Sequence, residues 1–184
     1  GASDAAATGE GHIEAPDSES AAAVYTIKLS KLTLTGGDNS QGGSIKIRTS
    51  YNSWVLDFSD LNFLNNKGTY GGAIYMKSFY WSDRITGQFS SIRFEGNEGR
   101  DGGAIWMQRQ SGVAMDALTF KDNKVEEYGG AMYLYSDASH SWRNYLSDIT
   151  VTDSVFEGNE ATKQGGAVFV RGNAGAGGKS TFTV

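Results

Sequence analysis

Apolar and polar residues alternate with period two in five short segments of the chain, and each segment follows a Gly-Gly pair. This alternation is typical of β-strands, because successive side chains of a strand point to opposite faces. A helical repeat would instead place apolar residues three and four positions apart. The segments therefore predict strands, and the glycine pairs predict corners with positive φ. The pairs are Gly42-Gly43, Gly71-Gly72, Gly102-Gly103, Gly129-Gly130 and Gly165-Gly166.

A second motif, F-x-x-N, stands before four of these glycine pairs. The distance from its phenylalanine to the first glycine is eight or nine residues, whereas successive copies begin 26 to 36 residues apart. One half of the repeat is therefore nearly constant, and the other half carries insertions. The motif residues are Phe63 with Asn66, Phe94 with Asn97, Phe120 with Asn123 and Phe156 with Asn159, and Leu34 begins a weaker first copy.

Repeats of about 31 residues with short strands and glycine corners predict an all-β fold, a right-handed parallel β-helix of about five coils over residues 21–184. Equivalent positions of stacked coils lie above one another, so the four phenylalanines should form an internal column. The four asparagines should form a hydrogen-bonded ladder beside it. The apolar positions after each glycine pair should face inward as two further columns: Ile45, Ile74, Ile105, Met132 and Val168, and Ile47, Met76, Met107, Leu134 and Val170.

The remaining positions of the alternating segments face outward and are mostly aromatic or basic. Exposed apolar patches usually mark contact surfaces, and aromatic and arginine side chains are preferred anchors of interfaces. The alternatives are that an insertion folds over this column, that stacking of the rings simply stabilises the coils, and that the aromatic residues of the insertions pack on their own coil. The expected contact face consists of Tyr75, Trp106, Tyr133, Phe169, Lys77, Tyr135 and Arg171, and the insertions add Tyr80, Trp81, Trp142 and Tyr145 as contact residues of second choice.

The coupling of F-x-x-N with Gly-Gly-Ala and an Ile, Val or Met resembles the repeats of the chlamydial polymorphic outer-membrane proteins. Four copies in register, within about residues 32–184, carry the resemblance. It implies a right-handed β-helix in a surface-exposed or secreted protein, usually an adhesin-like passenger of an autotransporter. It also implies a larger parent chain.

Charge and composition narrow the function classes. The net charge of −5 comes from residues 1–20, which hold five acids and no Lys or Arg, so that the rest of the chain has 16 acids and 16 bases. A neutral body offers no field that attracts nucleic acid, and we expect no nucleic-acid partner. The first 20 residues are mainly Ala, Gly, Ser and acids, which predicts a disordered acidic leader or linker. No apolar run is long enough to predict a membrane-spanning segment in this chain.

An enzyme is the alternative function, because parallel β-helices also carry polysaccharide lyases and glycoside hydrolases. Such sites need acids that converge on one outward face, and the outward columns contain none. With zero cysteines, and with His12 and His140 far apart, the sequence indicates no metal site and no cofactor. We therefore expect a non-enzymatic structural or adhesive module, at a cell surface or secreted, with a protein or a glycan as its partner.

The last copy of the repeat is expected to be followed by another. Phe182 lies 26 residues after Phe156, where a further F-x-x-N motif should begin. Open coil ends leave strand edges and core residues unpaired. Either the chain is part of a longer solenoid, or these ends allow end-to-end self-association into a filament.

Overall fold

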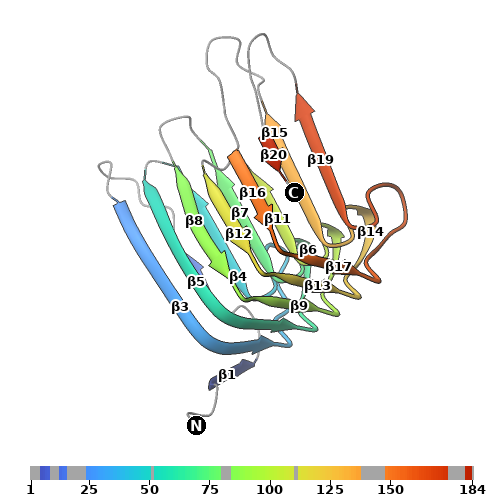
Figure 1. The fold of residues 1–184 in the computed structure, drawn as a ribbon, viewed down its shortest axis with the longest axis horizontal. Helices are drawn as coiled ribbons and strands as arrows, with labels where there is room; N and C mark the ends of the chain where they lie inside the picture. Colours follow the sequence, from blue (N-terminus) through green and yellow to red (C-terminus); the bar gives the residue numbers. More distant parts are fainter. Residues whose placement is uncertain are drawn as a thin grey trace.

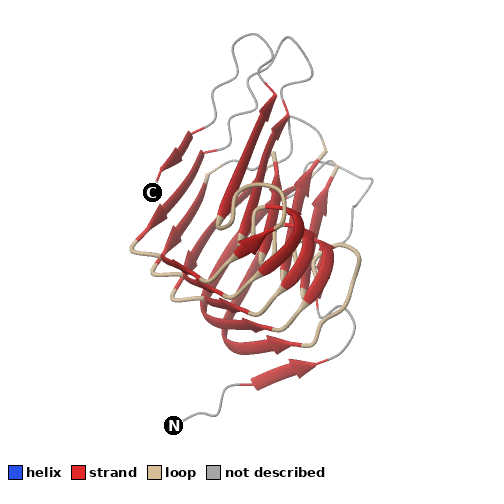
Figure 2. Ribbon diagram, turned by 90° about the vertical axis from the view of Figure 1, so that its right-hand side faces the viewer, coloured by secondary structure: helices blue, strands red, loops and turns tan. Residues whose placement is uncertain are grey.

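The computed structural model describes residues 5–8, 13–15, 24–50, 52–79, 84–109, 112–137, 148–173 and 181–183. Within these ranges every regular element is a β-strand, and the strands form three parallel sheets. The sheets run side by side along the stack of coils (Figures 1 and 2). The predicted fold class, an all-β parallel β-helix, is confirmed.

The first sheet has ten strands and contains the first part of each coil. In the first two coils this part is a single long, bent strand, β3 or β5. In each later coil two short strands take the place of that long strand (Figure 1). The strands are β1 (Ala5–Thr8), β3 (Val24–Thr35), β5 (Ser53–Leu64), β8 (Ile85–Ser90), β9 (Arg93–Glu95), β12 (Val113–Asp116), β13 (Thr119–Lys121), β16 (Asp148–Thr152), β17 (Val155–Glu157) and β20 (Thr181–Thr183).

The second and third sheets complete each coil. The second sheet contains β6 (Lys67–Tyr70), β10 (Glu98–Asp101), β14 (Lys124–Tyr128) and β18 (Glu160–Ala161). The third contains β2 (Ile13–Ala15), β4 (Ile45–Thr49), β7 (Ile74–Ser78), β11 (Ile105–Gln108), β15 (Met132–Asp137) and β19 (Val168–Asn173). The successive coils are therefore β3–β4, β5–β7, β8–β11, β12–β15 and β16–β19, close to the predicted number.

Residues with positive φ mark the corners of every coil. The first glycine of each Gly-Gly pair has φ between 66° and 70°, as predicted. A Cβ atom on Gly102 would lie 2.4 Å from the carbonyl oxygen of Ile105, which excludes other residues there. The bend of the first sheet also has positive φ, from 47° to 57°, although no glycine marks it. Its residues are Lys31, Asp60, Ser91, Ala117 and Asp153.

The phenylalanine column and the asparagine ladder form as predicted. Consecutive rings from Phe63 to Phe156 stack with centroids 4.7–4.9 Å apart and planes within 7°. The Asn97 amide oxygen accepts from the backbone N–H and the Nδ2 of Asn66, at 3.0 and 2.9 Å. The Nδ2 of Asn97 donates to the carbonyl of Phe63, at 3.0 Å, and Asn123 and Asn159 repeat the arrangement. Each coil thus supplies the hydrogen-bond partners of the previous one.

The two inward columns of the third sheet are also confirmed by the strand register. They are buried through the fourth coil, but Val168 is only half-buried and Val170 is 49% exposed. A further ring stack, Phe58 on Phe89 at 4.9 Å, lies in the first sheet and was not predicted.

Two predictions about the ends need correction. Residues 1–20 were expected to be disordered; of these, Ala5–Thr8 pairs with β3 and Ile13–Ala15 pairs with β4, and the other residues of this segment lie outside the described residues. Composition limits side-chain burial, whereas a strand can satisfy its backbone by pairing with an edge. Phe182 pairs with Ile149 and not with Phe156, so it does not begin an F-x-x-N motif. Insertions of variable length made the count from Phe156 unreliable.

Candidate contact surface

The outer face of the third sheet carries a stack of aromatic rings. Strand pairing places Tyr75, Trp106, Tyr133 and Phe169 in one column. The centroids of Tyr75 and Trp106 are 4.8 Å apart, those of Trp106 and Tyr133 6.0 Å, and those of Tyr133 and Phe169 5.4 Å. These rings pack in a cluster separate from the core, so the prediction that they lie on the outer face is confirmed.

Two tyrosines from the second sheet complete this surface and were missed by sequence reasoning. Tyr70 lies 5.7 Å from Trp106, and Tyr128 lies 4.8 Å from Phe169, measured between centroids. Each directly precedes a Gly-Gly pair, which is the signal that could have revealed it. The complete set, here called the outer aromatic cluster, is Tyr70, Tyr75, Trp106, Tyr128, Tyr133, Tyr135 and Phe169.

The expectation of exposed rings is wrong for the first three members of the column. Tyr75, Trp106 and Tyr133 are 3%, 7% and 6% exposed. The coil spacing lets each ring cover the face of the next, and the tyrosines of the second sheet cover the edges. Stacking within the molecule, one of the alternatives, therefore describes these three rings. Phe169 and Tyr135 remain half-buried.

Cations surround the cluster. The Arg100 guanidinium lies over the Tyr70 ring, 4.6 Å from its centroid, and donates a hydrogen bond to the Tyr70 hydroxyl. Lys163 lies 5.5 Å from the Tyr128 centroid and pairs with Glu127 at 3.0 Å, which raises the pKa of the lysine. These contacts place positive charge over electron-rich ring faces, a favourable arrangement.

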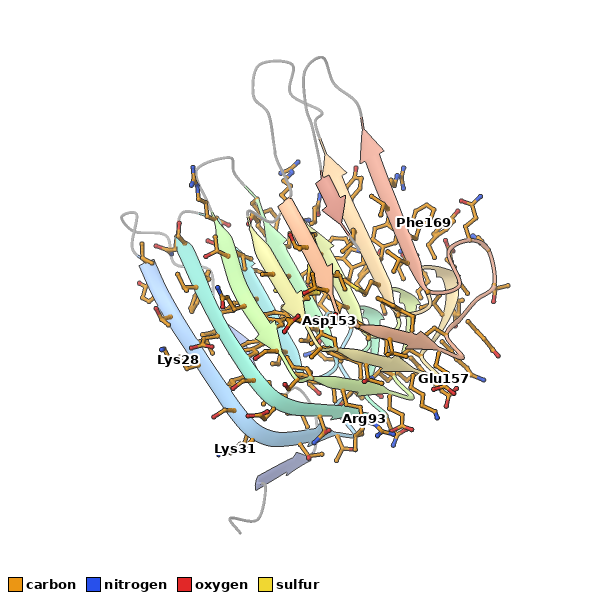
Figure 3. The ribbon with its side chains drawn as sticks, in the orientation of Figure 1. Lys28, Lys31, Arg93, Asp153, Glu157 and Phe169 are labelled. Atoms are coloured by element: carbon orange, nitrogen blue, oxygen red, sulfur yellow. The ribbon has the colours of Figure 1, made fainter. Side chains whose placement is uncertain are left out.

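Arg171 provides the exposed part of this surface. Its guanidinium lies 5.5 Å from the Tyr135 centroid and hydrogen-bonds the hydroxyl of Tyr133. Burial raises the pKa of that hydroxyl, and the bond to Arg171 opposes the rise. Phe169, two residues earlier on β19, lies at the same end of the stack (Figure 3).

Asp101 is a buried acid that lies in register between Tyr70 and Tyr128 on the second sheet. Its Oδ2 accepts from Arg100 Nε at 3.2 Å and its carboxyl also accepts the backbone N–H of Tyr128, while Oδ1 is buried without a hydrogen-bond partner among the described residues. Burial raises the pKa of this carboxyl. The pairing of β10 with β14 shifts between Gly99 and Asp101, where the fourth coil gains its extra residue. Asp101 thus provides a hydrogen-bond acceptor for the Tyr128 N–H at the register shift between β10 and β14.

The other predicted contact residues divide into two groups. Lys77 is half-buried, and its ammonium lies 4.4 Å from the centroid of Phe79, over which Arg48 also lies at 4.9 Å. The four predicted loop residues lie outside the described residues: Tyr80, Trp81, Trp142 and Tyr145.

Two shallow grooves lie on the other outer faces. One, of about 590 Å³, follows the second sheet past Lys67, Glu98 and Lys124. The other, of about 700 Å³, crosses the first sheet at Asp57, which pairs with Lys28 at 3.3 Å. Within the described ranges, no three His, Asp or Glu side chains are placed to hold a metal ion.

Comparison with known proteins relates the coils to a repeat family. Residues 60–77 and 153–171 match the family model described as the Chlamydia polymorphic membrane protein (Chlamydia_PMP) repeat. The chain carries this repeat. Neither the curated proteins nor the solved structures gave a significant match. The part of the chain that the structure describes contains no helix able to cross a membrane.

The matched repeat coincides with the half of the coil whose length is nearly constant among the copies in this chain. The first match runs from the bend at Asp60 to Lys77 on β7, and the second from Asp153 to Arg171 on β19. Each therefore includes one phenylalanine of the column, one asparagine of the ladder and one glycine corner. The repeat and the parallel β-helix together fit a repeat module of a surface protein.

Proposed function

We propose that this chain is a non-enzymatic display module of a cell-surface or secreted protein, which contacts a protein or a glycan. The β-helix acts as a rigid support, and the contact is made at the fifth-coil end of the outer aromatic cluster. One observation carries the proposal: the half-buried Tyr135 lies beside the exposed Arg171, whose guanidinium is 5.5 Å from its ring centroid, and the half-buried Phe169 lies two residues before Arg171 on β19.

The burial of the other rings supports placing the contact at this end of the cluster. The rings of Tyr75, Trp106 and Tyr133 are buried, so they support the surface and do not touch a partner. Phe169 caps the column, with its Tyr133 and Tyr128 contacts on one side. A planar guanidinium beside aromatic rings is a common anchor in protein interfaces, and ring faces also pack against sugars.

The contacts between coils indicate that the chain outside the contact surface acts as a scaffold. The asparagine ladder and the phenylalanine column fix each coil to the next without help from the outer residues. Outer side chains can then vary while the scaffold is retained, as in other repeat proteins. The match to a membrane-protein repeat family supports a location at the cell surface.

Binding of Arg171 variants to a glycan array and to intact cells tests the proposal. Arg171→Ala should weaken binding at least about tenfold, and Arg171→Lys should recover only part of it, because lysine lacks the planar fork. Arg93→Ala is the matched control, since Arg93 is an exposed arginine of the first sheet that pairs with Glu95. Unchanged binding by Arg171→Ala would contradict the assigned contact. Cleavage of an acidic polysaccharide by the chain would contradict its non-enzymatic character.

A further inference from the structure

Basic side chains from three successive coils meet at Phe79, which directly follows β7. The guanidinium carbon of Arg48 lies 4.9 Å from the centroid of the Phe79 ring, and the ammonium of Lys77 lies 4.4 Å from it. Arg109, which directly follows β11, donates a hydrogen bond from Nη1 to the Phe79 carbonyl at 2.6 Å. All three bases are half-buried, so each still has part of its surface in contact with solvent.

The backbone of Phe79 is fixed from both sides. Its N–H donates to the Thr49 carbonyl of the first coil at 2.9 Å, and its carbonyl accepts the bond from Arg109 of the third coil. A ring held in this way keeps the cations over it in a defined position. Binding groups that are already in place lose little freedom when a ligand arrives.

The third sheet differs from the other two in the order of its charges. On the first and second sheets, neighbouring coils place a base against an acid, as in the pairs Lys28 with Asp57, Lys67 with Glu98 and Lys124 with Glu160. On the third sheet, Arg48 is in register with Lys77, and like charges on neighbouring strands oppose their pairing. Local rules of this kind are broken mainly at functional sites.

The excess of positive charge extends along the third sheet. Its strands β4, β7, β11, β15 and β19 lie side by side in this order (Figure 1). Together they contain four bases and one acid, namely Lys46, Arg48, Lys77, Arg171 and Asp137. This face therefore attracts anions, although residues 21–184 as a whole are neutral.

The column that begins with Arg48 and Lys77 ends at Arg171. Gln108 and Tyr135 are the residues between them in the strand register. Neighbouring strands lie about 4.8 Å apart, so the backbone positions of the first and last members are about 19 Å apart. The bases at Phe79 and the base at the fifth coil are thus separated by a polar, uncharged stretch. The basic track, as we call this row, is Arg48, Lys77, Arg109, Gln108, Tyr135 and Arg171.

We infer that the basic track binds an extended acidic polysaccharide, whose sulfate or carboxylate groups pair with the bases at Phe79 and with Arg171. The inference rests on the proposed function, because Arg171 is the contact residue assigned there, and it names the class of ligand. Guanidinium and ammonium groups form their strongest hydrogen bonds with such anionic oxygens. The polysaccharide runs along the stack of coils, across the half-buried ring of Tyr135.

The spacing of the charges favours an acidic polysaccharide over other polyanions. Nucleic acid carries a charge at every nucleotide and is bound by continuous basic stripes. Here the amide of Gln108 and the phenol of Tyr135 interrupt the bases, and both are groups that hydrogen-bond to hydroxyls. A saccharide chain offers hydroxyls between its anionic groups, and its ring faces pack against aromatic rings.

Calorimetric titration with octasaccharides tests the inference. The probes are fragments of dextran sulfate, of polygalacturonate and of neutral dextran, so that sulfate and carboxylate are compared. At least one acidic octasaccharide should bind, and the neutral one should not. Lys77→Gln should weaken this binding about three- to fivefold, and the double variant Arg48→Gln with Lys77→Gln about tenfold. Lys67→Gln is the matched control, since it removes a half-exposed lysine of the second sheet.

Length and salt give two further readouts. A disaccharide of the same polymer cannot reach from Phe79 to Arg171, so it should bind at least about tenfold more weakly than the octasaccharide. Binding should also weaken steeply between low salt and about 1 M NaCl, where contacts between exposed charges are screened. Circular dichroism of every variant confirms that it is folded.

Four results would overturn the inference, and they separate it from the proposed function. If Lys77→Gln and the double variant bind normally while Arg171→Ala weakens binding, the contact at Arg171 stands and the basic track does not. If only Arg171→Ala binds normally, the proposed contact fails, and the anion site is confined to Phe79. Equal binding of polyglutamate or of an oligonucleotide would show that the track selects charge and not a saccharide. Failure of both acidic octasaccharides to bind would exclude the ligand class itself.

Discussion

The phenylalanine column and the outer aromatic cluster are both stacks of aromatic rings, but they differ in construction. In the phenylalanine column, identical rings from Phe63 to Phe156 stack with planes within 7°. In the outer aromatic cluster, the spacing between Trp106 and Tyr133 is 6.0 Å, and the plane of Phe169 is tilted by 33° from that of Tyr133. The inner stack repeats one residue, whereas the outer stack combines several kinds.

The difference shows two ways to bury a ring on a repeating backbone. The inner rings are enclosed by the sheets, and the asparagine ladder beside them fixes the register of each coil. The outer rings are covered by one another, by tyrosines of the second sheet and by cations such as Arg100. Only the inner arrangement requires the same residue in every coil, so the residues of the outer face can differ from coil to coil.

Removal of an inner ring should have the largest effect. Phe94→Ala should lower the free energy of unfolding by about 3–5 kcal/mol, because the ring is fully buried between two others. Chemical denaturation measures the change. Tyr25→Ala is the control, since this aromatic residue is 41% exposed, and it should cost less than about 1 kcal/mol. Similar losses of unfolding free energy in both variants would show that the phenylalanine column is not part of the stabilising core.

Removal of one ladder amide should follow. Asn97→Ala should cost about 3 kcal/mol, because it leaves the Asn66 backbone N–H and the Phe63 carbonyl buried without partners. Chemical denaturation is again the measurement. Asn62→Ala serves as the control: its Nδ2 contacts Thr33 on the partly exposed face at 3.3 Å, and less than about 1 kcal/mol should be lost. Equal losses of stability in Asn97→Ala and Asn62→Ala would show that the ladder does not stabilise the coils.

The phenylalanine column, the asparagine ladder and the glycine corners could be predicted because the same residue types recur in each copy of the repeat. Phenylalanine, asparagine and the glycine pair recur at equal distances, so the sequence itself reveals their register. The bend of the first sheet gave no such signal, because Lys31, Asp60 and Ala117 adopt the same positive φ with unlike side chains. Their backbone conformation follows from the stacking of coils and not from residue preference.

The outer surface was predicted in part. Alternation correctly placed Trp106 and Tyr133 on the outer face, but alternation cannot show what covers that face. Tyr70 and Tyr128 reach the cluster from another sheet, which requires the path of the whole coil. The ion pairs of Lys121 with Glu157 and of Lys124 with Glu160 were readable in principle, since FEGNE, FKDNK and FEGNE follow one another in successive copies.

Removal of an outer ring should have a smaller effect than removal of an inner one. Trp106→Ala should cost about 2 kcal/mol, since water can enter from the outer face and neighbouring rings can close the gap. Because the ring is 7% exposed, this variant reports on packing rather than on direct contact with a partner. Trp106→Phe should recover most of the loss. A loss for Trp106→Ala as large as that for Phe94→Ala would remove the distinction between the two stacks.

Substitution of Asp101 should have the smallest effect and should depend on pH. Burial raises the pKa of this carboxyl above its ordinary value near 3.8, and the contacts with Arg100 oppose the rise while the charge of Glu127 adds to it. The folded chain therefore binds the proton more tightly than the unfolded chain does. Its contribution to stability is fully present below the ordinary pKa and is lost as pH rises through the raised one.

Asp101→Asn should remove this titration while an amide oxygen still accepts the Tyr128 N–H. Relative to the unchanged chain, the variant should gain stability between pH 3.5 and pH 7, by less than about 1 kcal/mol, as thermal unfolding at both pH values would show. Asp57→Asn, at an exposed acid paired with Lys28, is the control, and an equal gain in this variant would show that the effect does not come from the burial of Asp101. A relative loss between the same pH values would mean that the pair with Arg100 outweighs burial. In that case Arg100 would stabilise the outer aromatic cluster in two ways, through its ion pair with Asp101 and through its contact with the Tyr70 ring.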